Sequence, residues 1–362
     1  MVDTLHARHV PPERPDEWHV NRDTIADPVY AHAFPRWKWP HVRRCFPHRR
    51  VRFAGPGDPL PDRGTLLLWG MTPLPTDLPP VVEVLRIEDG FLRSVGLGAE
   101  LARPLSWVAD RRGVYYDASR PSDLEILLAQ GEFSPDLRVR AAALRTRIVE
   151  AGLSKYNVGV AHWRRPPRAE QVVLVPGQVE SDASLAYGAP GIRTNIALLE
   201  AVRAARPNAY IVYKPHPDVV ARLRKMGDGE EQALDLCDEV VPDADIASLL
   251  DSVDEIQVLT SLAGFEALLR EKPVICHGQP FYAGWGLTTD WLPPARRHRR
   301  LQLDELVAGA LILYPWYLGR HGPIAPEQAL DELAAWKSRA GTRRPWWWEG
   351  YRALLRAFIG VR

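Results

Sequence analysis

Short apolar runs alternate with amphipathic segments throughout the second half of the chain. Each run is rich in Val, Ile or Leu and is bounded by turn-forming or charged residues, which is typical of a buried parallel strand. The predicted strands are residues 172–175, 210–213, 239–241, 255–259 and 274–276, and the predicted helices are residues 194–205, 219–226, 246–251 and 264–269. Strands and helices that alternate at this spacing predict a doubly wound α/β domain with a parallel sheet.

The first half has a similar but less regular pattern. Apolar runs predict buried parallel strands at residues 65–69 and 81–87 and a further strand at 114–116. Helical patterns cover residues 123–129 and 136–151, and Pro121 and Ser122 are the predicted cap of the first helix. Residues 1–60 show no clear period and predict an irregular arm with one short helix near residues 35–44. A polar, proline-bearing segment at 162–168 is the predicted linker.

These patterns predict two Rossmann-like domains that face a cleft. We expect an N-terminal domain over residues 1–165, a C-terminal domain over 166–320, and helices over 321–362 that pack back on the first domain. A chain of 362 residues is long enough for two domains of ordinary size.

Charge and cysteine content narrow the class of protein. Lys and Arg total 46 against 45 for Asp and Glu, so no global field favours nucleic acid, and any anion site must be local. The cysteines Cys45, Cys237 and Cys276 lie far apart and indicate neither a metal site nor a disulfide framework, which fits a reducing cytoplasm. No segment has the roughly 18 consecutive apolar residues that a spanning helix needs. We therefore expect a protein that is cytoplasmic, or peripheral at a membrane.

The most informative motif places Lys214 and His216 between prolines directly after the predicted strand 210–213. Prolines end the strand and stiffen the loop, so both side chains are expected at the carboxyl end of the sheet, where open α/β sheets bind ligands. A cation beside an imidazole predicts an anion, most simply a phosphate. The alternative is a proline-rich turn with solvated charges.

A second motif begins with Thr260 and Ser261, continues through Gly264 and places Glu266 on the following helix. Free NH groups at a helix N-terminus bind phosphate, so the two hydroxyl residues are candidate phosphate ligands, with N-capping as the alternative. We expect Glu266 in the first helical turn, where it accepts hydrogen bonds from ribose or is simply a surface carboxylate.

Further candidates follow other predicted strands. The loop of residues 277–288 carries Gln279, Tyr282 and Trp285 among glycines, which suits a flat ring or a sugar but also a tightly packed structural loop. Gln178 and Asp182 follow the first strand of the second half, at the border of the expected cleft. Asp182 is a candidate to contact the reactive carbon of a substrate, or a helix cap.

Another candidate cluster consists of Glu88, Asp89 and Arg93 and lies at the end of a strand in the first half. Adjacent carboxylates with a nearby arginine are candidates for an acid/base group and for a clamp on an acidic sugar, although the same residues form common turns. The chain lacks a P-loop, a complete dinucleotide-binding fingerprint, a zincin motif and a nucleophile elbow.

Seven motifs in order resemble the capsule polysaccharide biosynthesis family typified by KpsC. They are I-E-D-G-F-L-R-S (87–94), G-V-Y-Y-D (113–117), L-S-K-Y-N (153–157), G-Q-V-E-S-D-A-S (177–184), K-P-H-P-D (214–218), T-S-L-A-G-F-E-A-L-L (260–269) and G-Q-P-F-Y-A-G-W-G-L-T (278–288). The resemblance implies a GT-B-like pair of Rossmann domains and a retaining β-Kdo glycosyltransferase that uses CMP-Kdo and extends a Kdo-bearing, lipid-linked acceptor at the inner membrane. Better-known members carry two transferase modules, and residues 34–40 of this chain are more similar to the start of the second.

The resemblance also implies roles for the candidate residues. Asp182 matches the position of the family's catalytic aspartate and is expected to be the nucleophile. Glu88 or Asp89 is the candidate base. The remaining expectations are that Lys214, His216, Thr260 and Ser261 stabilise the leaving CMP, that Glu266 holds ribose, and that Arg93, or else Arg193, binds the Kdo carboxylate. We expect Gln178, Gln279, Tyr282 and Trp285 to contact substrate, and no metal or other cofactor to take part.

Residues 343–359 mix basic and aromatic side chains on a predicted helix. This composition suits a membrane headgroup layer, whereas packing back across the first domain is the favoured alternative. Two rival functions stay open: a GT-B glycosyltransferase or epimerase that uses another nucleotide sugar, and a non-catalytic module that scaffolds capsule assembly.

Overall fold

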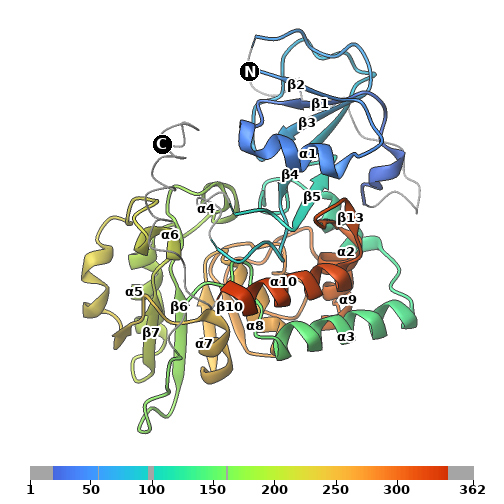
Figure 1. Cartoon of the computed structure of the whole chain (residues 1–362). Coiled ribbons are helices and arrows are strands. Elements are labelled where there is room, and N and C mark those ends of the chain that lie inside the picture. The colour runs from blue at the N-terminus through green and yellow to red at the C-terminus, as the bar shows by residue number, and fades with distance from the viewer. Residues whose placement is uncertain (1–18, 56, 97–101, 160–161, 341–362) are drawn as a thin grey trace.

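The computed structural model describes residues 19–55, 57–96, 102–159 and 162–340. Two sheets dominate the architecture, one in the upper part of Figure 1 and the other in the lower part. This two-sheet α/β arrangement confirms the expected GT-B-like fold class. The helix predicted over residues 343–359 lies outside the described residues.

The first sheet has seven strands in the order β13-β12-β5-β4-β3-β1-β2. Its strands are β1 (Val29–His32), β2 (Val51–Ala54), β3 (Thr65–Trp69), β4 (Glu83–Asp89), β5 (Ser106–Asp110), β12 (Pro315–Leu318) and β13 (Pro323–Ile324). The strands β2, β1, β3 and β4 pair in parallel, whereas β5, β12 and β13 add antiparallel pairs. The sheet is therefore mixed, and the chain returns to it near residue 315.

The second sheet has six strands, all parallel, in the order β11-β10-β9-β6-β7-β8. Its strands are β6 (Val172–Pro176), β7 (Tyr210–Lys214), β8 (Glu239–Val240), β9 (Glu255–Val258), β10 (Val274–Cys276) and β11 (Thr289–Asp290). The chain leaves β6 for β7 on one side and later enters β9 on the other. The direction of winding thus reverses between β6 and β9, and ligands of doubly wound sheets bind at such a reversal.

Helices flank both sheets. They are α1 (Trp39–Cys45), α2 (Asp123–Gln130), α3 (Pro135–Glu150), α4 (Ala183–Gly188), α5 (Asn195–Ala205), α6 (Pro217–Val220), α7 (Ile246–Ser252), α8 (Leu262–Leu269), α9 (Leu303–Val307) and α10 (Pro326–Ala340), with short 3₁₀ turns η2 (Arg22–Thr24), η3 (Arg36–Lys38) and η5 (Glu230–Asp235) and a π-helical segment η6 (Ala308–Leu313). Ser122 caps α2 by accepting the backbone N–H of Glu125, as predicted. None of the described helices is long and apolar enough to cross a bilayer.

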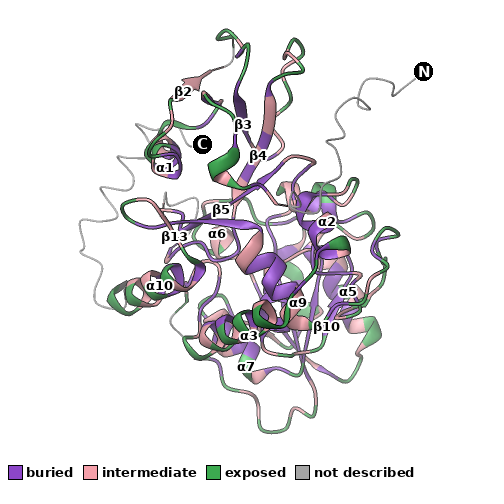
Figure 2. Cartoon of the chain, turned by 90° about the vertical axis from the view of Figure 1, so that its right-hand side faces the viewer, coloured by how far each residue is buried: buried purple, intermediate pink, exposed green. Residues whose placement is uncertain are grey.

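One hydrophobic core joins the two halves. It contains Phe91, Leu105 and Val108 from the first half and Phe265 and Phe281 from the second, all buried. The strands are mostly buried, while α3 and α10 present exposed outer faces (Figure 2). This core packs the two halves of the chain against each other.

Three predictions of local structure are wrong. Residues 29–32 and 51–54 form β1 and β2 instead of an irregular arm, because short strands need no long periodic pattern when β1 pairs with both β2 and β3. The short helix predicted near residues 35–44 is confirmed as α1. Residues 114–116 form a turn, and their apolar character reflects packing of the Tyr115 ring against Phe91 and Phe281. The helix predicted over 219–226 is only the single turn of α6.

The first sheet also bears on the predicted domain limits. Strands β12 and β13 pair with each other in that sheet, on either side of residue 320. Helix α10 contacts β12 and is tied to α3 by ion pairs such as Arg140–Glu327. The domain division at residues 165 and 320 stays a proposal. Because β12 belongs to the first sheet, the pairing favours an end of the second domain before residue 315 rather than at residue 320.

Candidate functional site

A cleft opens at the carboxyl ends of β6, β7 and β9. The empty volume of the cleft, including the part that is open to solvent, is about 1100 Å³. Seven of the predicted residues line it: Gln178, Asp182, Lys214, His216, Thr260, Ser261 and Glu266. The loops after three parallel strands meet here because their carboxyl ends share one edge of the sheet.

Gln178 connects the loop after β6 to the loop after β9. Its side-chain Nε2 donates to Thr260 Oγ1 at 3.0 Å, and its Oε1 accepts the Thr260 backbone N–H at 2.9 Å. Ser261 is the N-cap of α8, and its Oγ accepts the N–H of Ala263 at 3.3 Å. The capping alternative therefore holds for Ser261, which still lines the cleft.

Lys214 and His216 occupy the cleft as predicted. Lys214 is buried, its Nζ donates to the Pro242 carbonyl at 3.2 Å, and burial lowers its pKa. His216 caps α6, with its Nδ1 accepting the Asp218 N–H at 3.1 Å, and burial lowers the pKa of His216 to about 4. The imidazole is thus neutral near pH 7, and because Nδ1 accepts, the ring proton resides on Nε2.

Glu266 lies deeper in its helix than predicted. Helix α8 begins at Leu262, which places Glu266 in the second turn, and its Oε1 accepts the backbone N–H of Lys155 at 2.7 Å. Burial raises the pKa of Glu266 to about 7. This carboxylate joins the second half to a loop of the first half at the cleft wall.

Asp182 takes the N-cap position of α4, but its side chain makes no capping hydrogen bond. The residue is exposed and lines the cleft. Its charge raises the pKa of Tyr116, an effect added to the larger one of burial. The carboxylate of Asp182 therefore faces the cleft, where the cap alternative would have turned it to the backbone.

Glu88 and Asp89 end β4 and lie behind the cleft wall. Tyr116 Oη, which lines the cleft, donates to Glu88 Oε2 at 3.3 Å. Burial raises the pKa of Glu88 to about 7, helped by the Asp89 charge. Burial opposes ionisation of Asp89 as well, but Arg93 and nearby lysines outweigh it and hold the pKa of Asp89 at about 2. Of the two carboxylates, Glu88 has the contact with a cleft residue.

Arg93 does not reach the cleft. It is fully buried, and its Nε donates to Asp89 Oδ2 at 2.6 Å while Nη1 donates to Ser94 Oγ at 2.9 Å. Arg193, the other candidate, donates from Nε to the Ala189 carbonyl at 2.8 Å and does not line the cleft. Neither Arg93 nor Arg193 lines the cleft in this structure.

Most of the glycine-rich loop after β10 is packed against the protein, and Pro280 and Phe281 are its residues that line the cleft. Tyr282 and Trp285 are fully buried, with Tyr282 Oη donating to the Ser261 carbonyl and Trp285 Nε1 to the Phe281 carbonyl at 2.8 Å. Gln279 Nε2 donates to the Leu292 carbonyl at 2.9 Å. A Cβ at Gly264 would collide with the Tyr282 phenol, so glycine there permits close packing. None of the four predicted residues Gly264, Gln279, Tyr282 and Trp285 lines the cleft.

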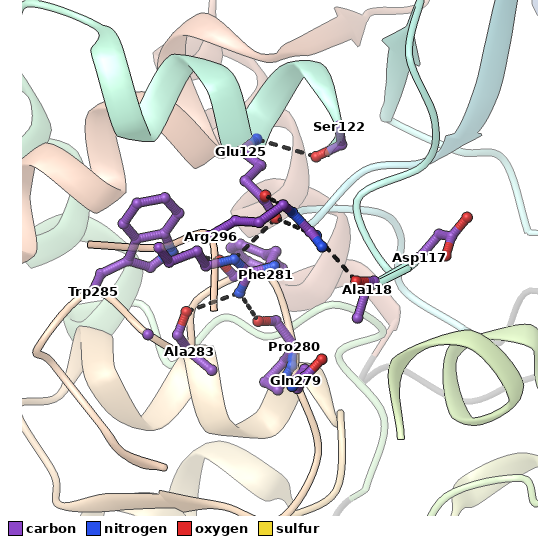
Figure 3. Close-up of polar contacts among 12 residues, drawn as sticks. Asp117, Ala118, Ser122, Glu125, Gln279, Pro280, Phe281, Ala283, Trp285 and Arg296 are labelled. Carbon is purple, nitrogen blue, oxygen red and sulfur yellow. Dashed lines mark hydrogen bonds and ion pairs between the residues drawn. The ribbon is translucent and has the colours of Figure 1, made fainter. Parts of the chain in front are cut away.

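An ion-pair network fastens this loop to the first half. Arg296 reaches Glu125 of α2 at 2.7 Å and the Ala118 carbonyl at 3.0 Å (Figure 3). The buried Arg297 donates to Glu125 at 3.0 Å and to the carbonyls of Pro280 and Ala283. Phe281, which lines the cleft, is held between these contacts.

The first half contributes cleft residues to which the sequence assigned no role. Tyr115, Tyr116, Lys155 and Tyr156 line the cleft. The Lys155 ammonium lies 5.3 Å from the centre of the Tyr156 ring. Burial opposes its charge, but Tyr156, Tyr115, Asp89 and Glu88 outweigh burial and raise the pKa of Lys155. The polar residues 153–157, which follow a long helix, could have indicated a functional loop, but only the fold shows that this loop lies at the cleft.

The described residues contain no group of three His, Cys, Asp or Glu side chains placed to hold a metal ion. The charged and titratable groups that line the cleft include two cations, Lys155 and Lys214, the neutral imidazole of His216, the exposed carboxylate of Asp182 and the buried carboxyl of Glu266. This set suits a ligand with a phosphate and a reactive centre near Asp182.

Two solved structures with high similarity to the chain come from one bacterium. The chain is 40% identical to the β-Kdo 2,7 transferase of Thermosulfurimonas dismutans KpsC, with 86% of this chain and 100% of that chain covered and a TM-score of 0.69. It is 33% identical to the β-Kdo 2,4 transferase of the same KpsC, with 84% and 97% covered and a TM-score of 0.72.

Curated relatives are longer proteins. The chain is 51% identical to the capsule polysaccharide modification protein LipA of Neisseria meningitidis, over 71% of this chain and 37% of LipA. It is 44% identical to the lipopolysaccharide-processing protein LpsZ of Rhizobium meliloti, over 75% of this chain and 64% of LpsZ. The chain thus spans less than two thirds of either relative.

The family model described as capsule polysaccharide biosynthesis protein matches residues 80–151 and 135–317. That match includes all seven cleft residues predicted from the sequence. On this match and the similarity to both KpsC transferases, the chain belongs to the capsule polysaccharide biosynthesis protein family.

Proposed function

We propose that the chain is a retaining β-Kdo glycosyltransferase that transfers Kdo from CMP-Kdo to a Kdo-containing, lipid-linked acceptor. The observation that carries the proposal is Asp182, an exposed carboxylate without a capping bond in the same cleft as Lys214 and His216. Similarity to two β-Kdo transferases over nearly their whole length supports the choice of sugar.

Donor binding uses the second half of the chain. The CMP phosphate lies between the Lys214 ammonium and the Nε2–H of His216, with the Thr260–Ser261 start of α8 as a further donor set. Glu266 and Gln178 shape the nucleoside side of the cleft. A histidine that stays neutral donates one directed hydrogen bond without adding a charge that titrates near pH 7.

The first displacement makes a bond between a carboxylate oxygen of Asp182 and the anomeric carbon of Kdo. The bond from that carbon to the phosphate oxygen breaks, and CMP leaves with the electron pair as a phosphate monoester. Lys214 and His216 stabilise the growing charge of this leaving group.

The second displacement restores the starting configuration. An acceptor hydroxyl oxygen attacks the anomeric carbon, and the Asp182 carboxylate leaves. The hydroxyl proton passes to Tyr116 Oη as the Tyr116 proton passes to Glu88. Tyr116 is the contact between Glu88 and the cleft, at 3.3 Å. Asp89, held ionised by Arg93, is a weaker base and serves instead to raise the pKa of Glu88.

A cation for the Kdo carboxylate comes from the first half. Lys155 lines the cleft, whereas Arg93 and Arg193 do not, so Lys155 takes the role that we expected of an arginine. We place the reaction in the cytoplasm, at the periphery of the inner membrane, where a lipid-linked acceptor is accessible.

Mass spectrometry tests the mechanism. Wild-type protein incubated with CMP-Kdo and no acceptor should gain the mass of one Kdo residue on the peptide that contains Asp182. Asp182→Asn should show no adduct and no transfer but bind CMP normally, and UDP should bind neither protein in the CMP site. Transfer that persists in Asp182→Asn would refute the double displacement, and an adduct from a different nucleotide sugar would refute the donor.

A further inference from the structure

A second pocket lies outside the cleft, between α1, the β12–β13 turn and α10. In both Figure 1 and Figure 2, β13 lies between these two helices. Seven described residues line the pocket: Arg44, Arg103, Arg320, His321, Glu332, Trp336 and Arg339. None of them lines the cleft. Its empty volume, again including the part that is open to solvent, is about 1100 Å³, ample for a phosphate or a monosaccharide.

Positive charge dominates this lining. Four of the seven residues are arginines, and Glu332 is the one carboxylate among them. Glu332 Oε2 accepts a hydrogen bond from Arg103 at 3.0 Å, so its charge is already shared with one guanidinium. The other carboxylates of α10 that form ion pairs, Glu327 and Asp331, are directed to Arg140 and Arg147 of α3. Helix α10 thus neutralises α3, and no ion pair among the described residues neutralises the pocket residues Arg44 and Arg320.

Arg44 is the most informative of these cations. Its Nη2 contacts His41 Nδ1, and its Nε is buried with no hydrogen-bond acceptor among the described residues. Burial lowers the pKa of His41 to about 3, so the imidazole is neutral and does not add to the repulsion. An arginine that is partly buried beside Arg103, with incomplete hydrogen bonding, favours an anion in the pocket.

The chemistry of the lining indicates the class of ligand. Guanidinium groups bind phosphate and carboxylate through paired N–H donors. Trp336, whose ring lies 5.9 Å from the Arg103 guanidinium carbon, adds a flat apolar wall suited to carbon atoms beside an anionic group.

We propose that this pocket is a second anion site, which binds a phosphate or carboxylate group of the acceptor. The acceptor assignment, unlike the anion site itself, rests on the proposed function, under which the acceptor carries both sugar carboxylates and a lipid phosphate. The pocket would then hold a distal part of an acceptor whose reactive hydroxyl lies in the cleft.

The test compares the full chain with two variants of equal charge change. Arg44→Gln/Arg320→Gln removes two pocket cations, and Arg140→Gln/Arg147→Gln removes two cations paired on α3. Arg320→Gln alone, in an exposed turn, serves if the first pair unfolds. Calorimetric titrations use inorganic phosphate and free Kdo, with CMP present at saturation to occupy the cleft, and sedimentation uses vesicles of phosphatidylglycerol or of phosphatidylcholine.

The wild type should bind at least one anionic probe, and the pocket variant should bind it about tenfold more weakly, while the α3 variant binds as the wild type does. Loss confined to phosphate and phosphatidylglycerol identifies the lipid phosphate, and loss confined to Kdo identifies the sugar carboxylate. Equal binding by all proteins, or equal loss in both variants, overturns the anion site. If CMP itself does not bind, the proposed function is contradicted. The anion site is then still decided by whether the pocket variant loses phosphate binding.

Discussion

Gln178 holds Thr260 by two hydrogen bonds, one to its hydroxyl and one from its backbone N–H, at 3.0 and 2.9 Å. The two residues follow β6 and β9, the strands between which the winding of the second sheet reverses. One amide side chain therefore sets the spacing of the two loops that form the nucleotide side of the cleft.

Replacing Gln178 with Ala should weaken CMP binding. Two hydrogen bonds are lost and the loop after β9 is no longer held, which we expect to cost about 1–2 kcal/mol, or about 5- to 30-fold in Kd. Titration calorimetry with CMP measures the change. Gln232→Ala, at an exposed position of η5, is the matched control and should bind CMP as the wild type does. Unchanged affinity in Gln178→Ala would show that Thr260 is not part of the CMP site.

The rate of transfer should rise with pH through about 7. The base must be deprotonated to accept the acceptor proton, and burial with the Asp89 charge raises the pKa of Glu88 to about 7. Glu88→Gln should abolish this rise of the pH–rate profile, which we call the basic limb, and lower kcat by about 10²- to 10⁴-fold, with CMP affinity retained. A limb that persists in Glu88→Gln would assign the titration to another group.

Lys38 should tune that same limb. Its buried ammonium lies over the ring of Trp69, and its charge lowers the pKa of Glu88. Lys38→Met retains the alkyl chain but removes the charge, so the limb should move to higher pH. The pH dependence of kcat measures this shift, and movement to lower pH, or none, would contradict the electrostatic contact.

Glu266 should make stability depend on pH. Its folded-state pKa of about 7 exceeds an ordinary carboxyl value, so the folded protein binds the proton more tightly and loses stability as pH rises from about 4.5 to 7. Glu266→Gln keeps an acceptor for the Lys155 N–H. Between about pH 5 and 8, the free energy of unfolding of the wild type should fall by about 2–3 kcal/mol relative to Glu266→Gln. Urea titrations measure the difference, and the exposed Glu231→Gln should show none.

Breaking the Glu125–Arg297 pair should destabilise the protein more than breaking a surface pair. Both side chains are buried, and Arg297 also donates to two loop carbonyls. Arg297→Met leaves Glu125 with one partner, Arg296, and should cost about 3–5 kcal/mol. Arg140→Met, which breaks the more exposed pair with Glu327, should cost no more than about 1 kcal/mol. Urea unfolding compares them, and similar losses would mean that Glu125 is not held in a desolvated pair.

The amino-acid sequence by itself determined five of the six strands of the second sheet and half of the cleft. Short β-branched runs bounded by proline or glycine carry a local strand signal, and parallel strands bring their carboxyl ends to one edge, so Gln178, Lys214, His216 and Thr260 had to meet. The tertiary structure alone decided that β12 returns to the first sheet, that Arg93 is committed to Asp89, and that Tyr282 and Trp285 are buried. It also placed Lys155 at the cleft, through a bond from its N–H to Glu266, 111 residues away. Such placements depend on burial and on contacts between distant segments, and no local pattern of side chains encodes either.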